Sequence, residues 1–330
     1  MRALLHRLSF ATLTVLLVLT VTFVALHLAP GDPVRLYLGP SADAAAAAAT
    51  RQALGLDRPV LVQYAEWLGR FVTGDWGTSI AQNRPVRTVV AEATGPTLLL
   101  TGLSLLLTYV CGVVLGAVQA SRPGSRRDAL ITTLTVTGAA IPSYVVALSL
   151  VWLLAYQTAI HGWPLWLRFP ALGAEGMGAD FLAPGARLGD RLRHLALPVA
   201  TLAIVGAAGA ARFARAALVD VLRQPFVRTA RAKGLSETRV VARHALRNAL
   251  VPLVTLVGLQ LPALFSGVVF VEAIFAWPGM GRVALAAVLG RDYPVVMAVT
   301  AVFATLVVLA NLLADAVVRA VDPRIRSAPG

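Results

Sequence analysis

Charged residues and cysteine are scarce in this chain. Only 14% of its 330 residues are charged, 58% are hydrophobic, and the mean hydropathy is +0.75. These values lie outside the range of soluble globular domains. The single cysteine, Cys111, lies inside an apolar run, so the sequence has no disulfide framework and no metal-ligand spacing. The chain is therefore expected to be a membrane protein.

Motifs for catalysis and nucleotide binding are also missing. We find no Ser/His/Asp arrangement and no metal-ligand pair, and Lys233-Gly234 does not stand in a Gly-x-x-x-x-Gly-Lys-Ser/Thr motif. Ionisable residues that would mark an ion relay are nearly absent from the apolar runs. Asp315 is the main candidate, but it lies near a helix end, one turn from Arg319. We expect no catalytic residue, no metal site and no cofactor in this chain, and an energy source in a partner.

The charge that is present has one dominant sign. The formal net charge is +13, and nearly all the positive residues are arginines in the gaps between apolar runs. Nucleic-acid binding would require a basic groove with interleaved aromatic residues, which the sequence does not show. Cytoplasmic loops of membrane proteins prefer Lys and Arg, which accounts for the pattern.

Six apolar runs are long enough to cross a hydrocarbon core, for which a helix needs about 20 residues. The first run also has the positive start of a cleaved signal peptide, but its length favours an uncleaved helix. The predicted fold is all-α and polytopic, with six transmembrane helices. The predicted spans are Leu8–Ala29, Thr97–Ala120, Ala129–Ile160, Leu195–Ala211, Val251–Val271 and Pro294–Ala314.

Small residues and proline predict features inside these spans. Gly102, Gly112 and Gly116 are spaced so that another helix can approach the second span closely. Pro142 interrupts the third span and is expected to kink it.

The long polar segment after the first span has two features. The residues around Ala44–Ala49 predict a short helix. Trp67, Phe71 and Trp76 have the spacing of an amphipathic segment at the bilayer surface. The favoured interpretation is an aromatic anchor, and the alternative is a lid near a transport path.

The most basic segment lies between the fourth and fifth spans. Gly234 stands at its middle between two helical patterns, and glycine suits the left-handed position that ends a helix. Ser236 is expected to cap the next helix, with Glu237 in its first turn. Leu235 and Val240 occupy the positions of a hydrophobic staple. The segment predicts a helix, a sharp turn and a second helix, which together form a docking element.

Charge also predicts the orientation. An even number of spans places both termini on one side. If that side is the cytoplasm, more than half of the 29 basic residues lie in short cytoplasmic segments, as the positive-inside rule requires. We expect cytoplasmic termini and a cytoplasmic docking element.

An ordered set of motifs extends over nearly the whole chain. Its members are Asp32-Pro33, Leu56–Pro59, Gly74–Gly77, Arg228–Ser236, Arg243–Asn248, Pro252, Val271–Arg282, Arg291–Pro294 and Asp322–Arg326. The set resembles the permease subunit of a bacterial ABC importer of the dipeptide, oligopeptide and nickel class, in its first-permease branch. The resemblance implies a type I ABC importer permease fold in the bacterial inner membrane.

The resemblance also implies a domain organisation and partners. Residues 1–29 would form the first transmembrane helix, 30–95 a long periplasmic loop, 96–318 a five-helix core with a coupling segment at 218–250, and 319–330 a cytoplasmic tail. The implied partners are a second homologous permease, two cytoplasmic ATP-binding subunits that hold ATP and Mg²⁺, and an extracytoplasmic substrate-binding protein.

The resemblance assigns candidate site residues. In importers of this kind, a Glu-Ala-Ala…Gly motif forms a coupling helix, and Ala230 and Gly234 match it. Arg228 stands in place of Glu, Thr229 in place of the second Ala, and Arg247 in place of a later Pro, which are departures that look typical of the peptide class. The implied ATPase-coupling residues are Arg228, Thr229, Ala230, Arg231, Lys233, Gly234, Leu235 and Ser236. The residues of a possible gate or outer loop are Glu272, Trp277, Pro278 and Gly279, and the alternative for Trp277 is an interfacial side chain in a tight outer turn.

The expected function is import of dipeptides or oligopeptides driven by ATP. Nickel and glutathione stay open as alternative substrates of the same fold. A secondary transporter would instead show an inverted repeat and buried charges near the midplane, and an intramembrane enzyme would show a nucleophile and a base within the spans; neither pattern is present.

Overall fold

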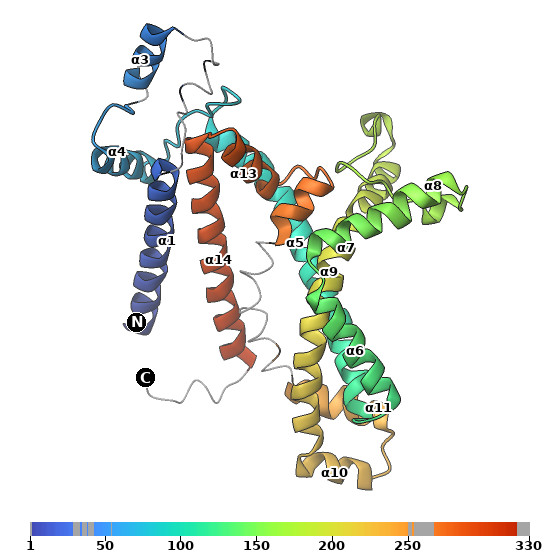
Figure 1. Cartoon of the computed structure of the whole chain (residues 1–330). Coiled ribbons are helices and arrows are strands. Elements are labelled where there is room, and N and C mark those ends of the chain that lie inside the picture. Colours follow the sequence, from blue (N-terminus) through green and yellow to red (C-terminus); the bar gives the residue numbers. More distant parts are fainter. Residues whose placement is uncertain are drawn as a thin grey trace. The chain divides into compact units, whose positions relative to one another are not determined.

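The computed structural model describes residues 2–28, 34, 38, 43–53, 55–249, 253 and 267–321. Over these residues the chain is helical (Figure 1), and the described part has no β-strand beyond one isolated bridge between Thr78 and Pro85. The chain divides into two compact units. The first comprises Met1–Thr97 with Pro278–Val308, and the second Leu98–Trp277 with Leu309–Gly330. Each unit has its own buried cores.

Among the described residues, five helices are long and apolar enough to cross a membrane. Each overlaps one of the six predicted spans, and the third predicted span, Ala129–Ile160, is matched only over Ser143–Ile160. The predicted fifth span, Val251–Val271, lies largely outside the described residues. Its described end belongs to a helical stretch at residues 267–274. The five are Ser9–Leu28 in α1 (Arg2–Leu28), α5 (Val86–Ser121), Ser143–Ile160, α9 (Pro184–Leu222) and Tyr293–Val317 in α14 (Tyr293–Val321).

Helices α5 and α9 begin about three turns before the predicted starts at Thr97 and Leu195. Residues 86–95, which were predicted as the end of the outer loop, are therefore helical. The added turns are amphipathic, so hydropathy does not reveal them. In α5, Val86, Val90 and Ala93 recur at helical spacing and are buried in the first unit, while the opposite face is exposed.

The predicted interruption at Pro142 is confirmed, but it divides the segment into separate helices rather than bending one. Helix α6 (Arg126–Ala140) ends where Ile141 turns extended, with ψ 123°. Proline disfavours helical conformation in the residue before it and donates no hydrogen bond of its own. The chain then continues through α7 (Ser143–Leu150), the π-helical η1 (Val151–Gln157) and α8 (Thr158–Ile160).

In the first unit, helix α4 (Val60–Val72) and the loop that follows it carry a ladder of aromatic rings. The ring centroids of Tyr64 and Trp67 are 6.3 Å apart, those of Trp67 and Phe71 5.1 Å, and those of Phe71 and Trp76 5.1 Å. The rings are half-buried and contact a core of α1 and α14 side chains, beside a cavity of about 480 Å³. The ladder therefore holds α4 against α1 and α14. The predicted short helix is also confirmed as α3 (Ala44–Ala53).

A buried carboxylate connects the loop before α5 to the start of α14. Asp292 is 1% exposed and accepts hydrogen bonds from the Ser79 hydroxyl at 2.5 Å and from the Ala81 backbone N–H at 3.1 Å. Its other oxygen accepts from the Val295 backbone N–H at 3.4 Å, in the first turn of α14. Asp292 follows α13 (Met280–Leu289), so one side chain fastens two distant segments of the first unit.

In the second unit, α5 and α9 approach closely through glycine. A Cβ added at Gly112 would lie 2.4 Å from the Ala210 Cβ, and one added at Gly116 would lie 2.6 Å from the Ala214 Cβ. The predicted close approach is confirmed at these two positions. At Gly102 an added Cβ would meet no atom of the described residues within 4 Å, so no close approach is seen there in this part of the chain.

Candidate coupling surface

The basic segment folds as the predicted helix, turn and helix. Lys233 is the C-cap of helix α10 (Pro225–Ala232), and Gly234 follows with φ +77°. The backbone N–H of Gly234 donates to the Arg231 carbonyl at 2.9 Å, which closes the last turn. Ser236 then begins α11 (Glu237–Arg239), which continues into the π-helical η4 (Val240–Ala245). In Figure 1, α10 lies at the lower end of α9, below α11 and α6.

Of two predicted details of the corner, the side-chain cap of Ser236 is wrong and the hydrophobic staple is confirmed. Ser236 occupies the N-cap position, with φ −62° and ψ 146°, but its side chain makes no capping hydrogen bond, so that prediction is wrong. Only its carbonyl serves the helix, accepting from the Val240 N–H at 3.0 Å. Leu235 and Val240 both belong to the same apolar cluster, as the staple predicts.

An ion pair that the sequence analysis did not predict spans the corner. The Arg231 guanidinium donates to both carboxylate oxygens of Glu237, at 3.0 Å from Nε and 2.6 Å from Nη2. Both side chains are about two-fifths exposed, so the pair contributes about 0.2–1 kcal/mol at most. The two residues are six positions apart across a turn. Ion pairs within a helix are expected at i,i+3 or i,i+4, so the sequence pattern did not predict this pair. The pair braces the end of α10 against the start of α11.

The corner rests on a buried apolar cluster. Val227 and Ala230 of α10 are 0% and 6% exposed, and Val240, Val241 and Ala245 of η4 are equally buried. These side chains pack on the C-terminal ends of α5 and α9, which contribute Ala120, Ala214, Leu218 and Leu222. The corner is therefore seated on two of the long helices.

The predicted coupling residues divide between two faces. Ala230 is buried and Leu235 is half-buried, so these two attach the corner to the core. The exposed members of the set are Arg228, Thr229, Arg231, Lys233, Gly234 and Ser236. Phe226, beside them on α10, is 42% exposed. The outer face of the corner is thus basic with one apolar side chain.

The predicted gate residues lie in a buried turn. Trp277 is 3% exposed, and Glu272 is 0% exposed. The Trp277 N–H donates to the Glu272 carbonyl at 2.9 Å, and the indole belongs to a core with Val271 and Phe275. An interfacial Trp277 is therefore wrong, because its ring is enclosed by the second unit. Pro278 is exposed and the buried Gly279 precedes α13; a gate role for these four residues stays a prediction.

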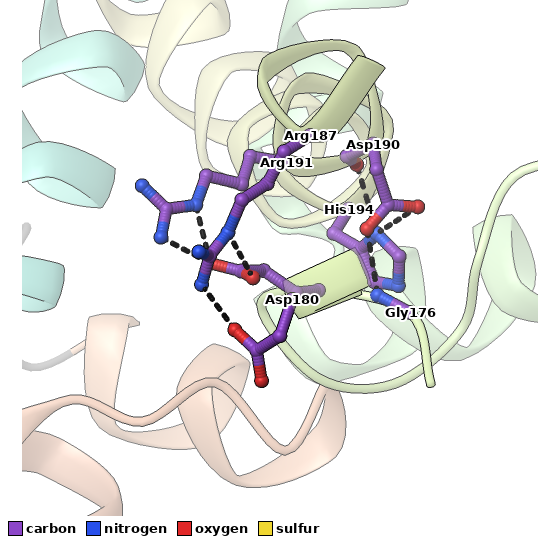
Figure 2. Close-up of polar contacts among 7 residues, drawn as sticks. Gly176, Asp180, Arg187, Asp190, Arg191 and His194 are labelled. Carbon is purple, nitrogen blue, oxygen red and sulfur yellow. Dashed lines mark hydrogen bonds and ion pairs between the residues drawn. The ribbon is translucent and has the colours of Figure 1, made fainter. Parts of the chain in front are cut away.

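A polar cluster fastens the loop before α9 to the first turns of that helix, as Figure 2 shows. Glu175 accepts from the Arg187 Nε at 2.9 Å and also from Arg191. Asp190 accepts from the Gly176 N–H at 2.6 Å, and His194 lies with Nδ1 2.9 Å from the Asp190 carbonyl. The i,i+4 spacing of the two arginines, and of Asp190 with His194, was the signal available in the sequence. In the described part of the chain, no group of three or more His, Cys, Asp or Glu is placed to hold a metal.

This cluster predicts how the loop responds to acid. The hydrogen bond from Arg187 is the main cause that lowers the pKa of Glu175, and burial opposes it. Because the folded-state pKa is depressed, the stabilisation is present above the ordinary glutamate pKa of about 4.3 and is lost as pH falls through the lowered value. We expect Glu175→Gln to raise hydrogen exchange of residues 171–183 already at neutral pH. The wild type should show that rise only in acid.

The control for this prediction is Asp180→Asn. Asp180 also pairs with Arg187, at 2.8 Å, but its side chain is 83% exposed. A much smaller rise in exchange is expected, because solvent screens an exposed pair. Equal exchange in Glu175→Gln and the wild type at neutral pH would contradict the role of Glu175.

Comparison with known proteins agrees with this architecture. The profile of the family described as "Binding-protein-dependent transport system inner membrane component" matches residues 112–327, and the profile of its N-terminal region matches residues 1–92. The oligopeptide transport system permease protein AppB of Bacillus subtilis is 40% identical over 98% of this chain and 99% of its own. The glutathione transport system permease protein GsiC of Salmonella paratyphi A is 39% identical over 95% of each chain.

A solved structure shares the fold. A chain of the MetNI methionine ABC transporter, in inward-facing conformations, superposes with a TM-score of 0.56 and 21% identity, covering 72% of this chain and 98% of that one. At this identity the likeness concerns the fold alone. The family profiles and the full-length relatives also establish the family of this chain. This chain belongs to the family of binding-protein-dependent transport system inner membrane components, and it is a multi-pass permease component of an ABC transporter.

Proposed function

We propose that this chain forms half of the translocation path of an ATP-driven importer of dipeptides and oligopeptides. The observation that carries the proposal is the exposed basic corner around Gly234, seated on the inner ends of α5 and α9. A rigid corner transmits force to the helices that it contacts, whereas a flexible loop would not. The names of the relatives, which include permeases for oligopeptides and for glutathione, support a peptide-like substrate.

The corner is proposed to dock in a groove of a cytoplasmic ATPase subunit. Its exposed arginines and Lys233 suit an acidic rim, and Phe226 supplies an apolar contact. This chain would bind no cofactor, and ATP with Mg²⁺ would be held by the ATPases. Closure of the ATPase pair would then swing the helices between inward-open and outward-open states.

The proposed orientation places both termini, and therefore the corner, in the cytoplasm. The excess of arginine in the short segments at this side supports it. One chain offers half of a path, so the proposed complex contains a second homologous permease, two ATP-binding subunits and an extracytoplasmic substrate-binding protein. Substrate selection would then rest largely with the binding protein.

The test is purification of the complex from native membrane, followed by assays of ATP hydrolysis and uptake in proteoliposomes. Recovery of a sister permease and two ATPases, with uptake of labelled dipeptide that requires ATP, is the expected result. Separate arms with glutathione and with chelated nickel distinguish the alternative substrates. Recovery of this chain alone, with uptake driven by an ion gradient in the absence of ATP, would overturn the proposal.

A further inference from the structure

A carboxylate, a carboxamide and a guanidinium meet at the inner ends of α5, α6 and α9. Asp128, in the first turn of α6, is 3% exposed. The Arg215 guanidinium of α9 donates to both of its oxygens, from Nε to Oδ1 at 2.7 Å and from Nη2 to Oδ2 at 2.7 Å. The Gly124 N–H donates to Oδ2 at 2.9 Å, and Gln119 of α5 lies with Nε2 3.4 Å from Oδ1. We refer to these four residues as the inner clamp.

In the inner clamp, the Asp128 carboxylate and the Arg215 guanidinium are both ionised. The hydrogen bonds from Arg215 are the main cause that lowers the pKa of Asp128 to about 2. A depressed carboxylate pKa means that the stabilisation is lost only as pH falls through that low value. The pair therefore stays ionised across the working range of a cell, about pH 5 to 8. Two parallel N–H···O bonds also define the relative orientation of the partners, not only their distance.

The inner clamp acts on the stretch of α9 that carries the corner. Arg215 precedes Leu222 by seven residues, about 10 Å along a helix. Between them, Leu218 is 0% exposed and packs with Leu222, Val227 and Ala230 in the cluster beneath the corner. If the corner tilts relative to α6, the end of α9 must move, and Arg215 on this stretch of α9 is bound to Asp128 of α6.

We propose that Asp128 and Arg215 are positioning residues for energy coupling. The pair fastens the α5–α6 hairpin to α9, so that a push on the corner moves these helix ends as one body. The inference rests on the proposed coupling role of the corner. According to this inference, energy coupling requires the corner and also a connection between α6 and α9, about two helical turns before the corner.

A purely stabilising pair would behave differently when both charges are removed together. Removing Arg215 leaves the Asp128 charge buried and uncompensated, which is strongly destabilising, whereas removing Asp128 leaves an Arg215 side chain that is 35% exposed and costs less. Replacing both partners of a buried pair with well-packed hydrophobic residues of similar volume is often neutral or stabilising. Arg215→Met follows this rule, and Asn at position 128 keeps an oxygen that can accept from the Gly124 N–H. The double replacement therefore separates the stability of the fold from the transmission of force.

The experiment compares three variants of the full complex in proteoliposomes: Asp128→Asn, Arg215→Met and the two combined. Thermal stability of the purified complex and peptide imported per ATP hydrolysed are both measured. The single variants are expected to lower stability. The double variant is expected to recover stability and complex assembly, yet to import about tenfold less peptide per ATP than the wild type. Arg215→Lys, which keeps the charge but not the two-pronged geometry, is expected to fall between them.

The control is an exposed pair of the same kind, Arg84 with Glu92, whose Nη2–Oε1 distance is 2.6 Å. Arg84→Met with Glu92→Gln is expected to leave import per ATP unchanged. Recovery of both stability and import per ATP in the Asp128→Asn/Arg215→Met variant would overturn the inference and leave the pair as a stabilising contact. Failure of the wild-type complex to import peptide with ATP would instead refute the proposed function itself, so the two failures are distinguishable.

Discussion

Replacing Gly234 with valine is expected to lower ATP-driven import by about tenfold or more, while the protein still inserts and is recovered in normal amounts. The reason lies in the backbone, because Gly234 has φ +77° and an added Cβ would meet no atom of the described residues within 4 Å. A left-handed conformation costs an L-residue about 1–2 kcal/mol, and each 1.4 kcal/mol corresponds to about a factor of ten in an equilibrium. Because β-branched side chains are least compatible with positive φ, valine should shift the corner out of its observed shape. Uptake of labelled peptide, normalised to inserted protein, is the measurement.

The matched control for this variant is Gly234→Asn. Asparagine visits the left-handed region several-fold more readily than other non-glycine residues, and the open space around Gly234 admits its side chain. Import by the asparagine variant is expected to lie close to that of the wild type. Wild-type import by the valine variant would contradict a coupling role for the corner.

Replacing Gly112 with leucine is expected to reduce the stability of the purified chain by about 1–3 kcal/mol or more, the usual effect of overpacking. At this position even a Cβ would lie 2.4 Å from the Ala210 Cβ and 3.1 Å from the Ala210 carbonyl carbon. The second neighbour is backbone, so no side-chain rotation relieves the clash, and α5 and α9 must separate. The measurement is the thermal unfolding midpoint in detergent, with the yield of monodisperse protein.

Gly102→Leu on the same helix serves as the comparison. No atom of the described residues lies within 4 Å of a Cβ added there, so leucine should be tolerated, and it has a higher helix propensity than glycine. The two variants share the helix and the substitution and differ in what the side chain meets. Equal stability of Gly112→Leu and the wild type would show that the close approach of α5 and α9 is not present.

Local signals in the sequence predicted much of the fold. The apolar runs predicted five helices that the structure describes, because span length and hydropathy depend on neighbouring residues alone. The corner was predicted for the same reason, since the left-handed Gly234 and the staple of Leu235 with Val240 are short-range features. The early starts of α5 and α9 were missed, because their first turns are amphipathic and resemble polar loop.

Contacts between distant residues were not predicted. Asp128 and Arg215 are 87 positions apart, and nothing in either local pattern names the other. The same holds for Trp277, whose neighbours in the sequence suggest an exposed turn although its ring belongs to a buried core with the distant Leu100, Leu195 and Leu197. Such pairs depend on how α6, α9 and residues 267–277 pack, which periodicity does not specify.

The length of α9 has a consequence for how the two sides of the membrane communicate. Its 39 residues extend about 58 Å, nearly twice the thickness of a hydrocarbon core of about 30 Å. No turn interrupts it between Arg187, which holds the loop cluster, and Leu222, beneath the corner. A binding event at one end that reorients this rod must alter the free energy of binding at the other. By thermodynamic linkage the reverse effect has the same size. Binding at the loop-cluster end of α9 is therefore expected to change the affinity of the corner for the proposed ATPase, and the reverse.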